Sequence, residues 1–167
     1  MKFTKGYWMN LPGVTNTDAV QVREVKVEND RVYLYTVPYH ADMRAMGGPL
    51  LEMYISSPQP DIIRTEAYHF MGSNQKMPAF ELNDAHCALE VENTETTVTI
   101  KSGNTKLVIG KNPCSFDYYY KDKKLTSIGN RFGNAMISTI STPDGNYMRA
   151  QMNLDIGEKV YGLGERF

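Results

Sequence analysis

This chain has few cysteines, almost no net charge and no N-glycosylation motif. It has two cysteines in 167 residues, Cys87 and Cys114, and no Asn-x-Ser/Thr motif. Two cysteines are too few for the disulfide framework of a small secreted domain, so we expect two free, buried thiols. The 18 basic and 19 acidic residues leave a net charge of −1. This balance excludes the basic surface that non-specific binding of nucleic acid requires.

Long apolar runs are also absent. Residues 1–5 lead into Gly6, Asn10 and Pro12 instead of an unbroken hydrophobic stretch. The sequence therefore predicts neither a signal peptide nor a membrane helix, and we expect a cytoplasmic protein with no membrane contact. The length, without a repeat or a linker, indicates a single domain over residues 1–167 that needs no metal for its stability.

Helical periodicity is missing too, and short alternating runs bounded by Gly, Pro, Asn or Asp take its place. Such runs are typical of β-strands. We expect strands over residues 20–27, 32–37, 50–56, 62–70, 88–92, 96–101, 106–109, 115–120 and 147–154. Residues 39–49 are expected to form a loop, and residues 122–124 and 143–146 to reverse the chain. This pattern predicts an all-β fold and favours a two-sheet antiparallel sandwich over a small barrel.

Clusters of catalytic or metal-binding residues are not visible. His40, His69 and His86 are 29 and 17 residues apart, without the short spacing that brings two imidazoles to one metal. His86 and Cys87 are neighbours, but successive strand residues point to opposite faces, which argues against a nucleophile pair. The serines lack a G-x-S-x-G motif, and no spacing singles out a pair among the carboxylates. We expect no catalytic residue, metal site or cofactor within the chain.

Five aromatic and acidic residues at positions 116–120 (FDYYY) allow two interpretations. With the period of a strand, Phe116, Tyr118 and Tyr120 share one face, and the intervening residues share the other. This arrangement suits a half-buried strand with an apolar inner side. The alternative is a carbohydrate platform on Tyr118 or Tyr120, because flat aromatic faces can hold sugar rings.

The last eight residues, 160–167 (VYGLGERF), carry a family resemblance. They resemble the segment that closes the amino-terminal sandwich of glycoside hydrolase family 31, just ahead of its catalytic (β/α)8 barrel. Further short segments are similar to the α-xylosidase branch of that family in order and spacing: Gly6-Tyr7-Trp8, Pro12-Gly13-Val14, Ser56-Ser57-Pro58, Asp61-Ile62-Ile63-Arg64 and His69-Phe70. The resemblance covers nearly the whole chain.

This resemblance implies a galactose-mutarotase-like antiparallel β-sandwich attached to a retaining enzyme that removes α-linked xylose from oligosaccharides. Two aspartates of the barrel would perform catalysis without cofactor or metal, and neither lies in this chain. The chain alone is therefore predicted to be inactive. Glu165, Arg166 and Phe167 would contribute to the junction between the sandwich and its own barrel, and the parent enzyme would form homo-oligomers. The alternatives are an α-glucosidase of the same family, or a module for carbohydrate binding or oligomerisation.

Overall fold

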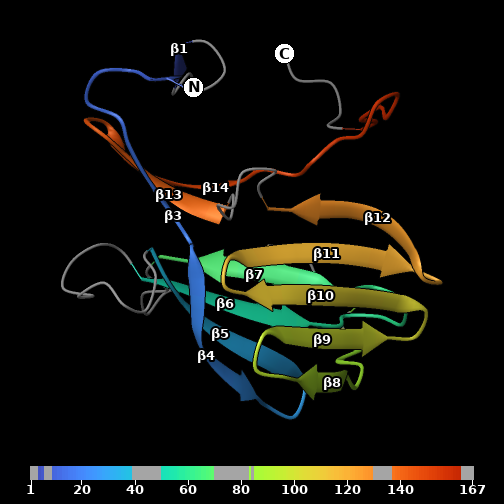
Figure 1. Cartoon of the computed structure of the whole chain (residues 1–167). Helices are drawn as coiled ribbons and strands as arrows, with labels where there is room; N and C mark the ends of the chain where they lie inside the picture. Colours follow the sequence, from blue (N-terminus) through green and yellow to red (C-terminus); the bar gives the residue numbers. More distant parts are fainter. Residues whose placement is uncertain are drawn as a thin grey trace.

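The computed structural model describes residues 4–5, 9–38, 50–69, 83, 85–129 and 137–162 (Figure 1). These residues form antiparallel strands joined by turns and irregular segments, and the described ranges contain no helix. The loop predicted for residues 39–49 lies outside them. Two sheets are stacked face to face, so the predicted all-β sandwich is confirmed.

The first of the two stacked sheets has four strands. They are β4 (Gln21–Val27), β5 (Arg31–Val37), β6 (Leu51–Ser56) and β7 (Arg64–Tyr68), and they follow one another in space as they do in sequence. Neighbouring strands pair antiparallel throughout. The alternating runs of the sequence predicted all four strands. In β5 and β6 alternate residues are buried, whereas β4 buries Val22 alone and all of β7 is half-buried.

The second stacked sheet has five strands in a meander. They are β8 (Glu90–Asn93), β9 (Thr97–Ser102), β10 (Thr105–Lys111), β11 (Cys114–Tyr120) and β12 (Lys123–Ile128). The spatial order is β12-β11-β10-β9-β8, so β12 and β8 are the two edges.

The reversal predicted for residues 122–124 is wrong at two positions. Lys123 and Lys124 are the first residues of β12, and the turn consists of Lys121 and Asp122 alone. Both turn residues have positive φ, 47° and 63°. A two-residue hairpin turn with both φ values positive matches the twist of its strands, which explains why the strand begins so early.

A third, smaller sheet crosses one end of the sandwich. It contains β3 (Thr15–Asp18), β13 (Ile137–Thr142) and β14 (Gly145–Ala150) in the order β14-β13-β3. A short pair, β1 (Thr4–Lys5) and β2 (Met9–Asn10), precedes it in the sequence. In Figure 1 the third sheet lies above the two stacked sheets, next to the end of β7.

The strand predicted for residues 147–154 ends earlier, at Ala150. Beyond it the chain turns towards β12, where Met152 forms an isolated antiparallel bridge with Ile128. The backbone N–H of Asn153 donates to the carbonyl oxygen of Ser127 at 2.8 Å. This short contact links the third sheet to the edge of the five-stranded sheet.

The core lies between the two stacked sheets. Alternate residues of β5 and β6 meet alternate residues of β9, β10 and β11, as the period-2 pattern requires. The apolar side chains with no exposed surface are Val32, Leu34, Met53, Ile55, Val98, Ile100, Leu107, Ile109 and Phe116.

Hydrogen bonds between turns close one side of the sandwich. Asp61, at φ 64°, accepts through Oδ1 from the backbone N–H of Asn104. The Thr105 hydroxyl donates to the carbonyl oxygen of Asp61 at 2.6 Å. The hydroxyls of Ser57 and Ser102 share a buried hydrogen bond of 2.6 Å. Together these bonds tie the turn before β7 to the β9–β10 hairpin.

Candidate functional site

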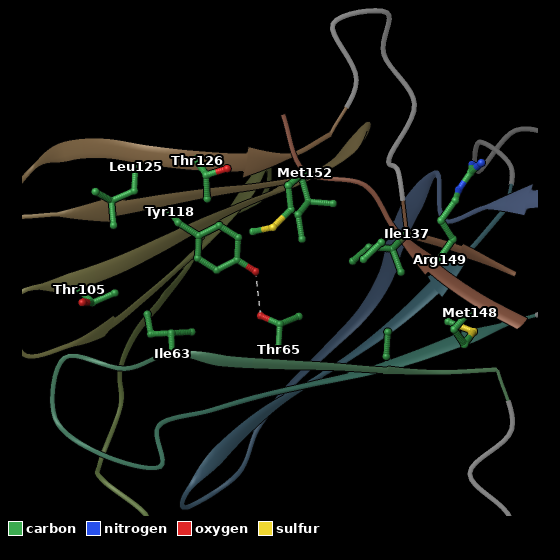
Figure 2. Close-up of a pocket in the computed structure, with 13 residues that line it drawn as sticks. Ile63, Thr65, Thr105, Tyr118, Leu125, Thr126, Ile137, Met148, Arg149 and Met152 are labelled. Atoms are coloured by element: carbon green, nitrogen blue, oxygen red, sulfur yellow. Dashed lines mark hydrogen bonds between the residues drawn. The ribbon is translucent and has the colours of Figure 1, made fainter. Parts of the chain in front are cut away.

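A groove opens where the edges of three sheets come together. β7 ends the four-stranded sheet, β12 ends the five-stranded sheet and β14 ends the three-stranded sheet. Side chains on and next to these strands surround a cavity of about 590 Å³ (Figure 2), which we call the inter-sheet groove. Its volume is in the range of cavities that hold small ligands.

The lining of the inter-sheet groove is predominantly apolar. It is formed by Ile63, Thr65, Ala67, Thr105, Tyr118, Leu125, Thr126, Ile128, Ile137, Met148, Arg149, Ala150 and Met152. Ile128 and Ile137 belong to the buried core, so the groove is continuous with the interior of the sandwich.

Tyr118 spans the groove between the two stacked sheets. Its hydroxyl shares a hydrogen bond of 2.9 Å with the hydroxyl of Thr65 on β7, and Figure 2 shows the ring directed across the cavity. Burial raises the pKa of Tyr118, while the bond to Thr65 opposes this effect. The phenol is therefore neutral at physiological pH and ties β11 to β7.

The other polar side chains of the groove also have partners within the chain. Arg149 donates from Nε to the Ser138 hydroxyl at 3.1 Å and from Nη2 to Asp18 at 3.4 Å. Figure 2 shows its guanidinium directed away from the cavity. The Thr126 hydroxyl donates to the carbonyl oxygen of Asn153 at 3.2 Å. What the groove offers is apolar surface, with its polar atoms already engaged.

Large apolar side chains of the groove remain in contact with water. Leu125, Met148 and Met152 are 50%, 41% and 55% exposed. A second hollow of about 320 Å³ shares Ala67 and Met148 with the groove and continues it between β7 and β14. Contiguous apolar surface of this kind marks sites of interaction.

The two tyrosines predicted as a carbohydrate platform occupy different surroundings. Tyr118 lies in the groove between the sheets, whereas Tyr120 is at the end of β11 with 37% of its surface exposed. The Lys121 ammonium lies 5.4 Å from the centre of the Tyr120 ring. The structure does not bring the two rings together as one flat surface, and glycan binding at either stays a prediction. Glu165, Arg166 and Phe167, predicted for the barrel junction, lie outside the described residues.

A row of tyrosines across the outer face of the four-stranded sheet was not singled out from the sequence. Tyr33 and Tyr54 have ring centres 5.4 Å apart, and Tyr54 and Tyr68 have ring centres 6.1 Å apart. Burial and a hydrogen bond to Glu52 raise the pKa of Tyr33 to about 12. The Arg31 guanidinium covers the Tyr54 ring at 4.8 Å. In the sequence these tyrosines alternate with apolar residues, and this was the signal that could have found them. The close approach of their rings depends on the register of the paired strands.

The histidines and cysteines do not form a catalytic group in the described part of the chain. His86 Nδ1 lies 3.3 Å from an exposed carboxylate oxygen of Asp30, and Cys114 is buried while Cys87 is partly exposed. Burial raises the pKa of the Cys114 thiol to about 12. Within the described ranges, no group of three or more His, Cys, Asp or Glu is placed to hold a metal ion. No described helix is long and apolar enough to span a membrane.

The antiparallel sandwich and the comparisons with known proteins define the class of domain. The fold is a galactose-mutarotase-like β-sandwich. Residues 52–167 match the family of the glycosyl hydrolase 31 N-terminal galactose mutarotase-like domain, and the chain belongs to this family.

Two relatives align with the whole chain. The alpha-xylosidase XylQ of Lactiplantibacillus pentosus is 27% identical over 174 residues, and an alpha-xylosidase of Emericella nidulans is 28% identical over 188 residues. The chain spans 22% and 24% of the lengths of these relatives.

Solved structures support the fold. The cycloalternan-forming enzyme of Listeria monocytogenes, in complex with a pentasaccharide substrate, superposes with a TM-score of 0.58 at 17% sequence identity. The match covers 80% of this chain and 11% of that protein. An uncharacterized protein from Listeria monocytogenes EGD-e gives the same score, identity and coverage.

Proposed function

We propose that this chain is the non-catalytic amino-terminal domain of a retaining α-xylosidase. The observation that carries the proposal is the alignment of the entire chain with two alpha-xylosidases of which it spans 22% and 24%. The matched family is by description an N-terminal domain of glycosyl hydrolase 31 enzymes. A domain of this kind would leave hydrolysis of α-linked xylose to a separate catalytic domain.

In the proposed enzyme, the sandwich packs on its own catalytic barrel and helps to shape the cleft that receives the oligosaccharide. Glu165, Arg166 and Phe167 would belong to this junction. The enzyme would act in the cytoplasm without a cofactor and assemble as a homo-oligomer. Sedimentation of the full-length enzyme tests the assembly, since a single monomeric species at micromolar concentration contradicts it.

The test compares two polypeptides made from the same gene: the 167-residue chain and the product of the uninterrupted reading frame that contains it. We expect release of nitrophenol from nitrophenyl α-xyloside by the longer polypeptide only. Nitrophenyl α-glucoside is the control for specificity, and faster turnover of that substrate would identify an α-glucosidase. Turnover of the xyloside by the 167-residue chain, or a stop codon directly after it, would overturn the proposal.

The exposure of the Tyr120 ring favours a second candidate function, binding of oligosaccharide by the sandwich itself. Aromatic rings with one open face bind apolar surfaces of ligands, and the phenol adds a polar contact. Calorimetry with a xyloglucan oligosaccharide tests this function on the 167-residue chain. Affinity that is lost in Tyr120→Ala would support it, whereas equal affinities or no heat with either protein would exclude Tyr120 as a platform.

A further inference from the structure

The inter-sheet groove is bounded by backbone edges as well as by apolar side chains. Each of the three sheets turns one terminal strand towards it: β7, β12 and β14. Among the described residues, β7 and β14 have a strand partner on one side only, and β12 is paired on its second side only near Ile128. An edge strand presents unpaired N–H and C=O groups that can pair with a further strand.

The other edges of the same sheets lie elsewhere. The five-stranded sheet ends in β8 on its far side, and the four-stranded sheet ends in β4. Neither β8 nor β4 contributes a residue to the lining of the groove. Among the described residues, the edges of β7 and β14 and the first half of the β12 edge therefore lie open around one apolar cavity.

The side chains of the groove suit a polypeptide better than a sugar. Sugar recognition depends on polar groups that are free to accept or donate, and here the polar groups of Tyr118, Arg149 and Thr126 already have partners. Leu125, Met148 and Met152 instead expose apolar surface to water. A strand with alternating apolar residues would cover these side chains and use the open backbone edges at the same time.

We propose that the inter-sheet groove receives an extended segment of the same enzyme, supplied by the part of the parent protein outside these 167 residues. This inference rests on the proposed function, because the relatives that align with the whole chain are about four times its length. The chain leaves β14 at the groove with Leu154, Ile156 and Val160 exposed. Further exposed apolar side chains therefore follow Met152 along the chain, as expected if more of the same polypeptide packs against this end of the domain.

Hydrogen exchange measured by mass spectrometry on the 167-residue chain and on the full-length enzyme tests this arrangement. We expect peptides covering β12 and β14 to exchange at least about tenfold more slowly in the full-length enzyme. The control is β8, the opposite edge of the sheet that contains β12, and its exchange should not change. Equal exchange of the β12 and β14 peptides in the two proteins would overturn the proposal.

A pair of matched substitutions gives a second readout. Leu125 in the groove and Val27 at the end of β4 are similarly exposed, at 50% and 56%. In the 167-residue chain, Leu125→Asp and Val27→Asp should each shift the Tm by no more than about 2 °C. In the full-length enzyme, only Leu125→Asp should reduce the yield of folded protein, by about tenfold or more, because it places a charge in a buried contact. Equal yields of the two variants would contradict the inference.

The remaining outcomes separate this inference from the proposed function. Protection of β12 and β14 that appears in the 167-residue chain and increases with its concentration would assign the groove to a second copy and overturn the inference. Protection in a full-length protein that hydrolyses no α-xyloside would support the groove contact and reject the proposed function. A full-length protein that hydrolyses the α-xyloside but shows no protection at the groove would support the proposed function and reject the groove contact.

Discussion

The hydrogen bond between Tyr118 and Thr65 offers a direct test of how the two sheets are held together at the groove. Tyr118→Phe and Thr65→Val each remove one hydroxyl and nearly preserve the volume of the side chain. The two hydroxyls are 2.9 Å apart, partly buried and separated by 53 positions in the sequence. A neutral hydrogen bond contributes about 0.5–1.5 kcal/mol to stability. Because water can reach this groove, we expect a coupling energy of about 0.5–1 kcal/mol.

Urea unfolding followed by circular dichroism measures this coupling in a double-mutant cycle. Each single variant should lower the unfolding free energy by about 1 kcal/mol. In thermal unfolding of a domain of this size, this loss corresponds to a fall in Tm of about 2–4 °C. Tyr119→Phe is the matched control, since Tyr119 lies on the opposite face of β11 and keeps its ring contact with Lys106 at 5.0 Å. Additive effects of Tyr118→Phe and Thr65→Val, with no measurable coupling, would refute the role of this bond as a tie between the sheets.

Three further predictions concern the core and the turns. Phe116→Ala should cost about 3–5 kcal/mol of unfolding free energy, because Phe116 is fully buried in the core; a loss below about 1 kcal/mol in urea unfolding would contradict this packing. Burial raises the pKa of the Cys114 thiol from its ordinary 9.0 to about 12, so the unfolding free energy should fall as the pH rises from about 9 towards 12, and Cys114→Ala should remove this part of the slope. Gly103→Ala should destabilise the chain by more than about 1 kcal/mol, because φ is +57° and a Cβ there would lie 2.2 Å from Asp61 Oδ1. An unchanged Tm for Gly103→Ala would argue against the close approach of the two turns.

Eight of the nine strands of the two stacked sheets could be predicted from the sequence because their signals are local, whereas β12 was not predicted. In β5, the buried Val32 and Leu34 alternate with the half-buried Tyr33 and Tyr35, and this alternation is visible in the residues themselves. The turn at Lys121 and Asp122 was misplaced because neither residue is the glycine or asparagine that commonly marks positive φ. The short strand β3 carries Thr15, Asn16 and Asp18, without the apolar alternation that indicates a strand.

The candidate site could not be predicted, because its parts meet only through the fold. Tyr118 was correctly placed on a strand, but its contact with Thr65 depends on how two sheets are stacked. Met148 and Leu125 lie on strands that are adjacent in neither sequence nor sheet, and each would be an ordinary exposed side chain by itself. The family resemblance indicated a partner domain, whereas the location of the exposed apolar surface depends on how the three sheets pack.

The part of the β12 edge that has no strand partner among the described residues has a consequence for the order of events during synthesis. If three further lengths of about 167 residues follow the sandwich, the ribosome needs about 25–100 s to complete them at about 5–20 residues per second. Throughout that interval, Leu125 and Met148 would be exposed in a crowded solution of other nascent chains. Lys123, exposed at the start of β12, adds a charge of the kind that discourages pairing between identical edges. A charge at that position would keep the edge available until the later segment arrives.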